Sequence, residues 1–328
     1  MVDVATAPAA LPGPLEQSLE AYRAELTGYC YRMLGSGFEA EDAVQETYIR
    51  AWRSYAGFEG RAALRTWLYR IATNVCLNMV QGQQRRARPM DLGPAAGSSS
   101  DRYETLPESR WIRPVPDGQV LAAVDDPAEQ AAGRDSIRLA FIAALQYLPP
   151  RQRAVLILRD VLRWRAREVA DLLGTSLVSV KSALQRARAQ LAANNPGPAG
   201  PSEPTSADQQ QLLARYIDAF ERYDVESLVA LLHEDATLSM PPMTLWLHGS
   251  DALRAWWEGD GAECRGSRVV PTVAANGSPA CGSYRPGPDG RYQASAIHVL
   301  DVAEDRIIGL NVFVDPSLFP MFGLPLSL

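Results

Sequence analysis

The chain has 328 residues, a 47% share of apolar residues and a net charge of −6, which allows two or three domains that each bury a core. The absence of a run of about eighteen apolar residues argues against a membrane span, and the N-terminus lacks the basic start and apolar core of a secretion signal. The four cysteines form no CxxC pair, so we expect neither a zinc site nor a disulfide framework, and we interpret the protein as cytoplasmic, without metal or cofactor.

The first helical segment, residues 19–90, begins with a helix that ends near Gly35. The next helix, residues 39–52, has two faces. Its buried side carries three apolar residues, Val44, Tyr48 and Ala51. Its other side carries mainly polar residues at helical spacing, namely Asp42, Gln45, Glu46, Ile49 and Arg50. Such a face is ordinarily solvated, and the aliphatic Ile49 within it indicates a partner surface.

The segment FEGRAALRTWLYRIATNVCLNMVQGQQRRARP, residues 58–89, predicts a glycine-bearing loop followed by a long helix. Aromatic, basic and amide side chains lie along one flank, namely Trp67, Arg70 and Asn74. We expect the helix to end in Arg85, Arg86 and Arg88. Binding of unstacked bases needs rings for stacking, hydrogen bonds to base edges and positive charge for the backbone. The alternative, in which Trp67 and Tyr69 are simply core residues, stays open.

A linker follows at residues 91–133, and GPAAGSSS gives it a flexible start. Within it, LPESRWIRPVPDG places Trp111 and Ile112 among prolines. These two residues either pack on a later domain or anchor the linker to a neighbouring helix. The linker is acidic, with three Arg against eight acidic residues.

The stretch from Val161 to Arg188 predicts a helix, a tight turn and a second helix, as in proteins that enter the DNA major groove. Gly174 lies where the chain reverses, and Ser176 can cap the second helix. The inward stripe of that helix is apolar, namely Val180, Ala183, Leu184 and Ala187. Its outward side carries hydroxyls and arginines, which suit base edges and phosphates. The alternative is an ordinary helical hairpin with a solvated basic face.

Basic charge is concentrated in the two helical segments. Residues 19–90 carry ten Arg against seven acids, and residues 134–191 carry ten Arg and Lys181 against four acids. Residues 207–328, in contrast, carry eight Arg against sixteen acids. This division predicts contact with a polyanion in the two helical segments alone.

A Pro/Gly/Ser-rich linker then leads into a segment of about 120 residues with helices first and strands afterwards, which predicts an α+β domain. We expect an amphipathic helix over residues 209–223, a second helix and strand in VESLVALLHEDATLSMPP, a short helix in DALRAWWEG, and strands in SRVVPTVAANG and in residues 293–315. The chain thus divides into a disordered leader (1–18), a helical domain (19–90), a linker (91–133), a helix-turn-helix domain (134–195), a linker (196–206) and an α+β domain (207–328).

Two of these motifs carry a resemblance to a known family. The run EDAVQETYIRAW with LRTWLYRIATNVCLN resembles region 2 of bacterial sigma-70-type transcription initiation factors, and residues 148–191 resemble region 4. The layout, with no further sigma region between them, is similar to the extracytoplasmic-function group. The resemblance implies two all-α domains, no catalytic residue, and a linker that threads through the polymerase.

The resemblance also implies a role for each group of residues. Residues on the DxxQE helix would bind the clamp of the largest polymerase subunit, and region 4 would lie near the flap. The clamp-binding residues would be Asp42, Gln45, Glu46, Ile49 and Arg50. Those that capture a flipped base of the −10 element and hold its phosphates would be Phe58, Arg61, Arg65, Trp67, Arg70, Asn74, Arg85, Arg86 and Arg88. Those that contact the −35 element would be Thr175, Ser176, Ser179, Lys181, Ser182, Gln185, Arg186 and Arg188. The family often has a polar residue and an arginine where this chain has Leu177 and Ala183, so the −35 sequence does not transfer.

The C-terminal segment resembles the SnoaL-like members of the nuclear-transport-factor-2 and ketosteroid-isomerase superfamily, a cone with an apolar pocket. Its titratable candidates are His233, Asp235, His248, Asp251 and His298. No motif orders them into an acid/base pair, and LHED could equally be a helix end. We therefore predict that the segment is not an enzyme but senses a small ligand or makes an intramolecular contact. Its acidic balance could place it over a basic helical domain and occlude DNA.

The leading interpretation is a promoter-specific initiation factor that binds core RNA polymerase and promoter DNA and has no membrane partner. Its activity would be modulated by its own C-terminal domain. Two alternatives are a free-standing helix-turn-helix regulator and a small-molecule enzyme with a DNA-binding attachment. The helix from Asp42 to Arg50 favours the first interpretation, because a free repressor has no use for such a surface.

Overall fold

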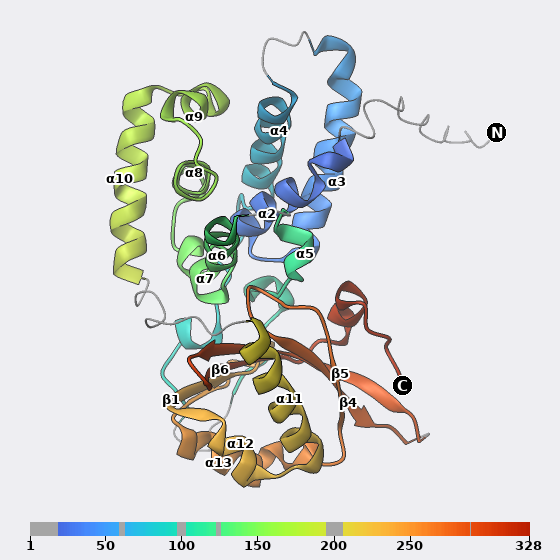
Figure 1. The fold of residues 1–328 in the computed structure, drawn as a ribbon. Coiled ribbons are helices and arrows are strands. Elements are labelled where there is room, and N and C mark those ends of the chain that lie inside the picture. The colour runs from blue at the N-terminus through green and yellow to red at the C-terminus, as the bar shows by residue number, and fades with distance from the viewer. Residues whose placement is uncertain (1–18, 59–62, 97–102, 123–125, 195–205, 289) are drawn as a thin grey trace, which may run out of the picture.

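The computed structural model describes residues 19–58, 63–96, 103–122, 126–194, 206–288 and 290–328. Two groups of helices lie side by side, and a C-terminal domain built on one mixed sheet lies beneath both (Figure 1). The predicted leader, residues 1–18, lies outside the described residues, as does all of the predicted linker 196–206 except its last residue.

The first helical group consists of α2 (Arg23–Leu34), α3 (Gly37–Ser54), the 3₁₀ turn η1 (Tyr55–Gly57) and α4 (Leu64–Met79). Helix α2 ends where predicted, because Gly35 takes a left-handed φ of 75° and its N–H donates to the Tyr31 carbonyl at 2.7 Å. The buried rings of Tyr29 and Tyr69 pack with centroids 5.1 Å apart and fix α2 against α4.

The prediction that this last helix continues to Arg85, Arg86 and Arg88 is wrong, because α4 ends at Met79. After it, Gly82 takes a left-handed φ of 77°, and the chain becomes extended. The Ala87 N–H donates to the Arg110 carbonyl at 2.8 Å, so this stretch pairs with the linker before the 3₁₀ turn η2 (Pro89–Asp91). The three arginines therefore lie on a non-helical segment that follows α4 and pairs with the linker.

The linker is packed along much of its described length and contains the 3₁₀ turn η3 (Glu108–Arg110) and the short helix α5 (Asp117–Val120). Trp111 and Ile112 are both buried. The Ile112 N–H donates to the Ala87 carbonyl at 3.1 Å, and the Leu106 N–H donates to the Pro242 carbonyl at 3.0 Å. Ile112 thus belongs to the core that the helical groups share with the sheet, while the linker contacts the C-terminal domain at Leu106.

The second helical group consists of α6 (Pro127–Asp135), α7 (Leu139–Gln146), α8 (Pro150–Leu156), the π-helical turn η4 (Ile157–Val161), α9 (Ala166–Leu173) and α10 (Leu177–Asn194). Helix α6 crosses the boundary predicted at residue 133. The helix-turn-helix of α9 and α10 is confirmed: Gly174 has a left-handed φ of 59°, and the Ser176 hydroxyl accepts from the Ser179 N–H at 3.1 Å.

The C-terminal domain begins with α11 (Ser206–Arg222) and α12 (Val225–Ala230), and a third helix, α13 (Ser250–Glu258), follows β2. Its strands are β1 (Leu232–Ser239), β2 (Trp246–His248), β3 (Arg268–Pro271), β4 (Ala280–Pro286), β5 (Tyr292–Ala303) and β6 (Arg306–Phe313). The 3₁₀ turns η5 (Asp260–Cys264) and η6 (Pro316–Phe322) complete it. The strand order is β2-β1-β6-β5-β4-β3, and only the β1–β6 pair among these neighbours is parallel.

Three details of this domain differ from the predictions. LHED opens strand β1 and does not end a helix. Strands β2 and β4 lie where no strand was predicted. The sequence of β4, ACGSYRP, is rich in residues that strands disfavour, and Gly282 is required by packing, because a Cβ there would lie 2.5 Å from Leu324.

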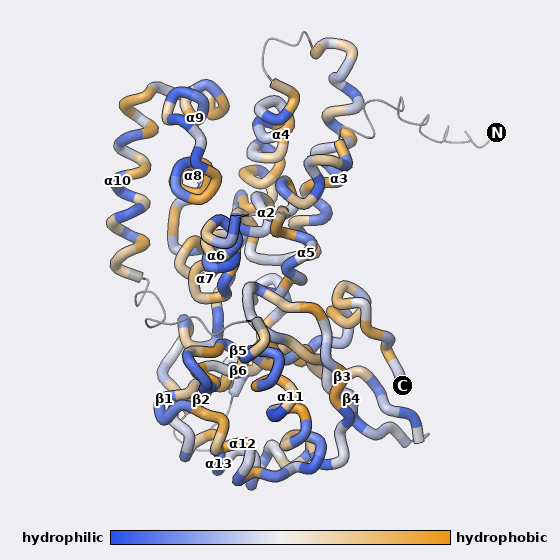
Figure 2. The backbone as a smooth tube through the Cα atoms, viewed as in Figure 1, coloured by the Kyte–Doolittle hydropathy of each residue, from blue (hydrophilic) through white to orange (hydrophobic). Residues whose placement is uncertain are grey.

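Two apolar cores flank the sheet. One lies between the sheet and helices α11–α13 and includes Tyr216, Leu253 and Leu310. The other runs from the two helical groups through the linker to the opposite face of the sheet, where Ile297 and Phe319 belong to it. Polar and apolar residues alternate along α10 (Figure 2), as expected for a helix with one buried stripe. The C-terminal domain therefore shares a core with the helices.

Candidate nucleic-acid interface

The predicted partner face on α3 is open to solvent. Asp42, Gln45, Ile49 and Arg50 are exposed, and Glu46 is half-buried and pairs with Arg50 at 2.6 Å, one helical turn away. An exposed pair of this kind contributes only about 0.3–0.5 kcal/mol, so these charges are free to change partners. The face combines acidic, amide and aliphatic groups without a covering element among the described residues.

An aromatic cluster lies at the start of α4. The rings of Phe58 and Trp67 have centroids 4.8 Å apart, and Tyr55 stacks beside Phe58 at 6.2 Å. Tyr69 is fully buried, as the core alternative predicted, whereas Trp67 is only partly buried and packs against the edge of the core. Arg61 lies outside the described residues. The cluster offers ring faces at the place where stacking on unpaired bases was predicted.

The basic and amide residues of α4 are divided between solvent and the second helical group. Arg65 pairs with Glu25, with 2.7 Å between its Nε and the carboxylate, and lies 5.0 Å from the Trp164 ring. Arg70 donates to the Asp171 carbonyl of α9 at 3.0 Å. Asn74 is exposed. Helix α9 thus occupies part of the flank of α4 on which DNA contacts were predicted.

The three arginines after α4 hold protein groups in this arrangement. Arg86 is buried, pairs with Glu39, and donates to the Trp111 carbonyl at 2.7 Å. Arg88 pairs with Asp91 at 3.2 Å. The Arg85 guanidinium lies 3.7 Å from the ring centroid of Tyr147, which lies between α7 and α8. Arg86 therefore faces inward and is not open to a phosphate, which corrects the prediction for this conformation, since a buried cation needs its partners.

The outward face of α10 is open. Its exposed members are Thr175, Ser176, Ser179, Lys181, Gln185, Arg186 and Arg188, and Ser182 is half-buried. Arg186 donates to the Ser182 hydroxyl at 2.6 Å, and Arg188 pairs with Asp160 at 2.7 Å. Hydroxyls, an amide and basic groups therefore share one surface, as predicted.

Three exposed arginines before and at the start of α9, which had no predicted role, extend this basic surface, namely Arg163, Arg165 and Arg167. Arg163 takes a left-handed φ of 58° in the turn that leads into α9. In a helix-turn-helix the first helix crosses the phosphate backbone, so arginines at its beginning suit that role. The run RWRAR was the available signal.

Two buried arginines join the helical groups. Arg153 of α8 donates to the Met33 carbonyl at the end of α2 and to the Gln146 side chain at 2.7 Å. Arg32 donates to the Ser136 hydroxyl at 2.6 Å. Burial lowers the pKa of each guanidinium to about 10, so both stay charged at neutral pH. No periodic pattern marks these residues, because their partners are distant in sequence.

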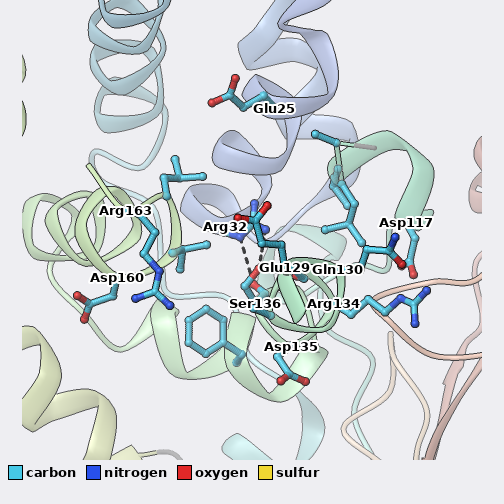
Figure 3. Close-up of a pocket in the computed structure, with 18 of the residues that line it drawn as sticks. Glu25, Arg32, Asp117, Glu129, Gln130, Arg134, Asp135, Ser136, Asp160 and Arg163 are labelled. Carbon is cyan, nitrogen blue, oxygen red and sulfur yellow. Dashed lines mark hydrogen bonds between the residues drawn. The ribbon is translucent and has the colours of Figure 1, made fainter. Parts of the chain in front are cut away.

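A cavity of about 1120 Å³ separates the helical groups beside Arg32. It is lined by α2, α6 and η4, with Arg32 and Ser136 joined on one side and Asp160 and Arg163 on the other (Figure 3). The junction between the two groups is therefore hollow. Polar contacts such as the Arg32–Ser136 hydrogen bond flank this cavity, beside the apolar core that the two groups share.

Asn276 joins the C-terminal domain to three other parts of the chain. Its amide nitrogen donates to the Tyr31 hydroxyl at 2.7 Å and to the Ile137 carbonyl at 2.6 Å. Its amide oxygen accepts from the Val115 N–H at 3.0 Å. The side chain is 1% exposed. One residue thus links α2, the second helical group and the linker to the sheet domain.

The linker contributes the ion pair of this junction. Arg113 pairs with Asp315 and donates to the Ser317 hydroxyl at 2.9 Å. Other contacts across this junction include backbone hydrogen bonds, the Gln119 amide donating to the Met321 carbonyl at 3.3 Å, and apolar packing of Met321 against Gly37. The net charge of the C-terminal domain therefore does not determine where this domain packs. The domain lies far from the first turn of α10 (Figure 1). Occlusion of that turn by the acidic domain is not seen in this arrangement.

The five titratable candidates of the C-terminal domain fall into two sets. His233, Asp235, His248 and Asp251 are exposed, and His248 lies 4.0 Å from Asp235. His298 is buried, with the Tyr216 hydroxyl 2.9 Å from Nδ1 and the Ser283 hydroxyl 3.1 Å from Nε2. Tyr216 and Phe220 fill the space beside its ring. Among the described residues, no group of three or more potential ligands could hold a metal ion.

We expect acid to destabilise this domain through His298. Burial lowers the pKa of His298 to about 4 from its ordinary value of 6.5, so the folded state keeps the ring neutral while the unfolded state gains a proton below pH 6.5. The free energy of unfolding should therefore fall by about 3 kcal/mol between pH 6.5 and pH 4. Urea denaturation at each pH, monitored by hydrogen exchange of the amides in β4 and β5, measures this free energy of unfolding.

Replacement of His298 by glutamine is the control for this prediction. Glutamine keeps hydrogen-bonding capacity but does not titrate. The free energy of unfolding of the variant should therefore depend less on pH over the same range. An unchanged pH dependence in the variant would contradict the assignment to His298.

Comparison with known proteins assigns the three parts of the chain. Family models match Sigma-70 region 2 at residues 19–86, Sigma-70 region 4 at residues 138–191 and a SnoaL-like domain at residues 213–310. The chain is 48% identical over 322 residues to the ECF RNA polymerase sigma factor SigG of Mycobacterium tuberculosis, which covers 96% of this chain and 85% of that one. It is 28% identical to SigJ of the same organism, over 94% of this chain and 93% of that protein.

The crystal structure of Mycobacterium tuberculosis SigJ shares the fold, with a TM-score of 0.59 and 23% identity over 96% of this chain and 100% of that one. Two sigma-70 regions followed by a SnoaL-like domain define the class. The chain belongs to the extracytoplasmic-function group of RNA polymerase sigma factors. In the part of the chain that the structure describes, no helix has the length and apolarity to cross a bilayer.

Proposed function

We propose that this sigma factor binds core RNA polymerase through the open face of α3 and contacts the −10 element with the Phe58–Asn74 segment. The outward face of α10 and the arginines at the start of α9 contact the −35 element. The observation that carries this proposal is the presence of both open surfaces, α3 and α10, on one chain. A free-standing repressor would use the second surface and has no use for the first.

The arrangement in the structure is a closed one. The nominal positions of the −10 and −35 elements lie about 25 base pairs apart, roughly 85 Å of duplex at 3.4 Å per base pair. A stretch this short is nearly straight unless free energy is spent to bend it, because the persistence length of DNA is about 150 base pairs. Helices α4 and α9, however, are in direct contact through Arg70 and Asp171. The two helical groups must therefore separate before both elements can be held.

The residues that resist this separation are those at the junctions. Arg32 beside the cavity and Arg153 near the end of α2 hold the helical groups together, and Asn276 ties both groups to the C-terminal domain. We infer that the C-terminal domain modulates activity by stabilising the closed arrangement and that it performs no catalysis. His298, a buried histidine of the domain, has its polar contacts with Tyr216 and Ser283.

Run-off transcription tests the proposal. Purified core polymerase and fragments of genomic promoter DNA, with and without the full chain, are the components. We expect new transcripts that depend on the chain, and co-elution of the chain with core polymerase in size-exclusion chromatography. The absence of both results would overturn the proposal.

A further inference from the structure

The second helix of the helix-turn-helix begins with two exposed aliphatic residues. Val178 is 76% exposed, more than any other large hydrophobic residue that the structure describes, and Leu177 beside it is 44% exposed. One exposed aliphatic residue on a surface needs no explanation. Two in the first turn of the helix that enters DNA call for one, because water solvates them poorly.

Val178 lies at the middle of the outward face. At 3.6 residues per turn it stands roughly opposite the buried stripe of Val180, Leu184 and Ala187, in line with Ser182 and Gln185. The hydroxyls of Ser176 and Ser179 bond to each other at 2.9 Å, so the cap occupies them. The valine side chain is therefore the most exposed large apolar group of this turn.

The surroundings of Val178 are basic. The helix α10, LVSVKSALQRARAQLAAN, contains no acidic residue, and Lys181 and Arg186 follow Val178 on exposed positions. This charge complements the phosphates of DNA, so in the proposed complex the apolar first turn enters a groove. Within the major groove, the C5-methyl group of thymine is the apolar group that the base edges present.

We propose that Val178 contacts a thymine C5-methyl group in the −35 element and so selects thymine at that base pair. This inference rests on the proposed role of α10. Valine neither donates nor accepts a hydrogen bond, so a cytosine at this position would leave its N4 donor against methyl groups. The specificity of this first turn is thus set by shape and apolar contact.

Deoxyuridine provides the test, because it pairs like thymidine and lacks only the C5-methyl group. The probes are two duplexes of a promoter recovered by the holoenzyme from genomic DNA, one with thymidine and one with deoxyuridine throughout the −35 element. We expect the wild-type holoenzyme to bind the deoxyuridine duplex about fourfold more weakly for each methyl in contact. The Val178→Ala holoenzyme should bind the thymidine duplex more weakly and show a smaller loss, close to none, on deoxyuridine.

Val273→Ala is the matched control, since Val273 is 56% exposed on the C-terminal domain. It should lose as much affinity on deoxyuridine as wild type does. Alanine is a good helix former at an exposed position, so Val178→Ala should fold normally. An equal loss on deoxyuridine for wild type and Val178→Ala, or no loss for wild type, would overturn the inference. Failure of wild type to bind even the thymidine duplex would instead overturn the proposed function on which it rests.

Discussion

Replacing Asn276 by glycine should release the C-terminal domain from both helical groups. The change removes three hydrogen bonds and leaves the Val115 N–H and the Ile137 carbonyl buried without their partner. Each such loss costs about 1–3 kcal/mol, so we expect the junction to weaken by roughly 3–4 kcal/mol. Glycine is preferred to alanine because Asn276 has a left-handed φ of 54°, and glycine adopts this conformation without strain.

Hydrogen exchange measures this effect. Amides of the linker between residues 104 and 117 should exchange roughly 100-fold or more faster in the variant, while those of β5 and β6 should be unchanged. Asn276→Asp serves as a second variant, because it keeps the acceptor oxygen and loses the two donors. If promoter binding by the holoenzyme is also stronger in Asn276→Gly, the closed arrangement opposes activity. Unchanged linker exchange would show that Asn276 does not hold the junction.

The point variant Asn276→Gly tests whether the C-terminal domain modulates activity more cleanly than deletion of that whole domain does. Trp111, Ile112 and Val115 are buried in the full chain. Removal of the sheet would uncover part of this apolar linker surface, and loss of activity could then reflect aggregation. Asn276→Gly leaves both apolar cores in place.

Reversing the charge of Asp42 and Glu46 together should abolish binding to core polymerase. Both residues belong to the open face of α3, and like charges placed across an interface cost several kcal/mol, so the affinity should fall by at least about 100-fold. The fold should survive, because Asp42 is exposed and the Glu46–Arg50 pair contributes little. Co-elution with core polymerase and fluorescence anisotropy measure the change.

The matched control is the double reversal of Asp251 and Glu258 on α13. These residues are exposed, and Glu258 approaches Arg254 at 3.8 Å one turn away, much as Glu46 approaches Arg50. The control changes the net charge equally and should bind core polymerase normally. If both doubles bind as wild type does, the α3 face is not the polymerase contact.

The elements that local chemistry specifies were predicted correctly. Gly35 and Gly174 ended helices, Ser176 capped α10, and the apolar stripe of Val180, Leu184 and Ala187 is buried. Each of these signals acts over a few residues, so a single sequence carries it. The order of helices and strands in the C-terminal domain followed in the same way, except for the short β2 and the Gly- and Ser-containing β4.

Interactions between distant residues could not be predicted in this way. Arg86 was assigned to phosphates because it lies in a basic run, yet it is buried against Glu39 and the linker. Arg153 and Asn276 carry no pattern, because a buried polar side chain is defined by partners that folding brings to it. Periodicity marks which face of a helix is buried but not which element covers it.

The ion pair between Arg113 and Asp315 joins two parts of one polypeptide, and this has a consequence for how the protein can be controlled. A separate inhibitor binds in proportion to its concentration, whereas a tethered partner has a fixed effective concentration and a fixed one-to-one ratio. Raising the amount of the protein in a cell would increase its closed and open forms by the same factor. Their ratio changes only if something binds one form more tightly than the other, as core polymerase or promoter DNA would.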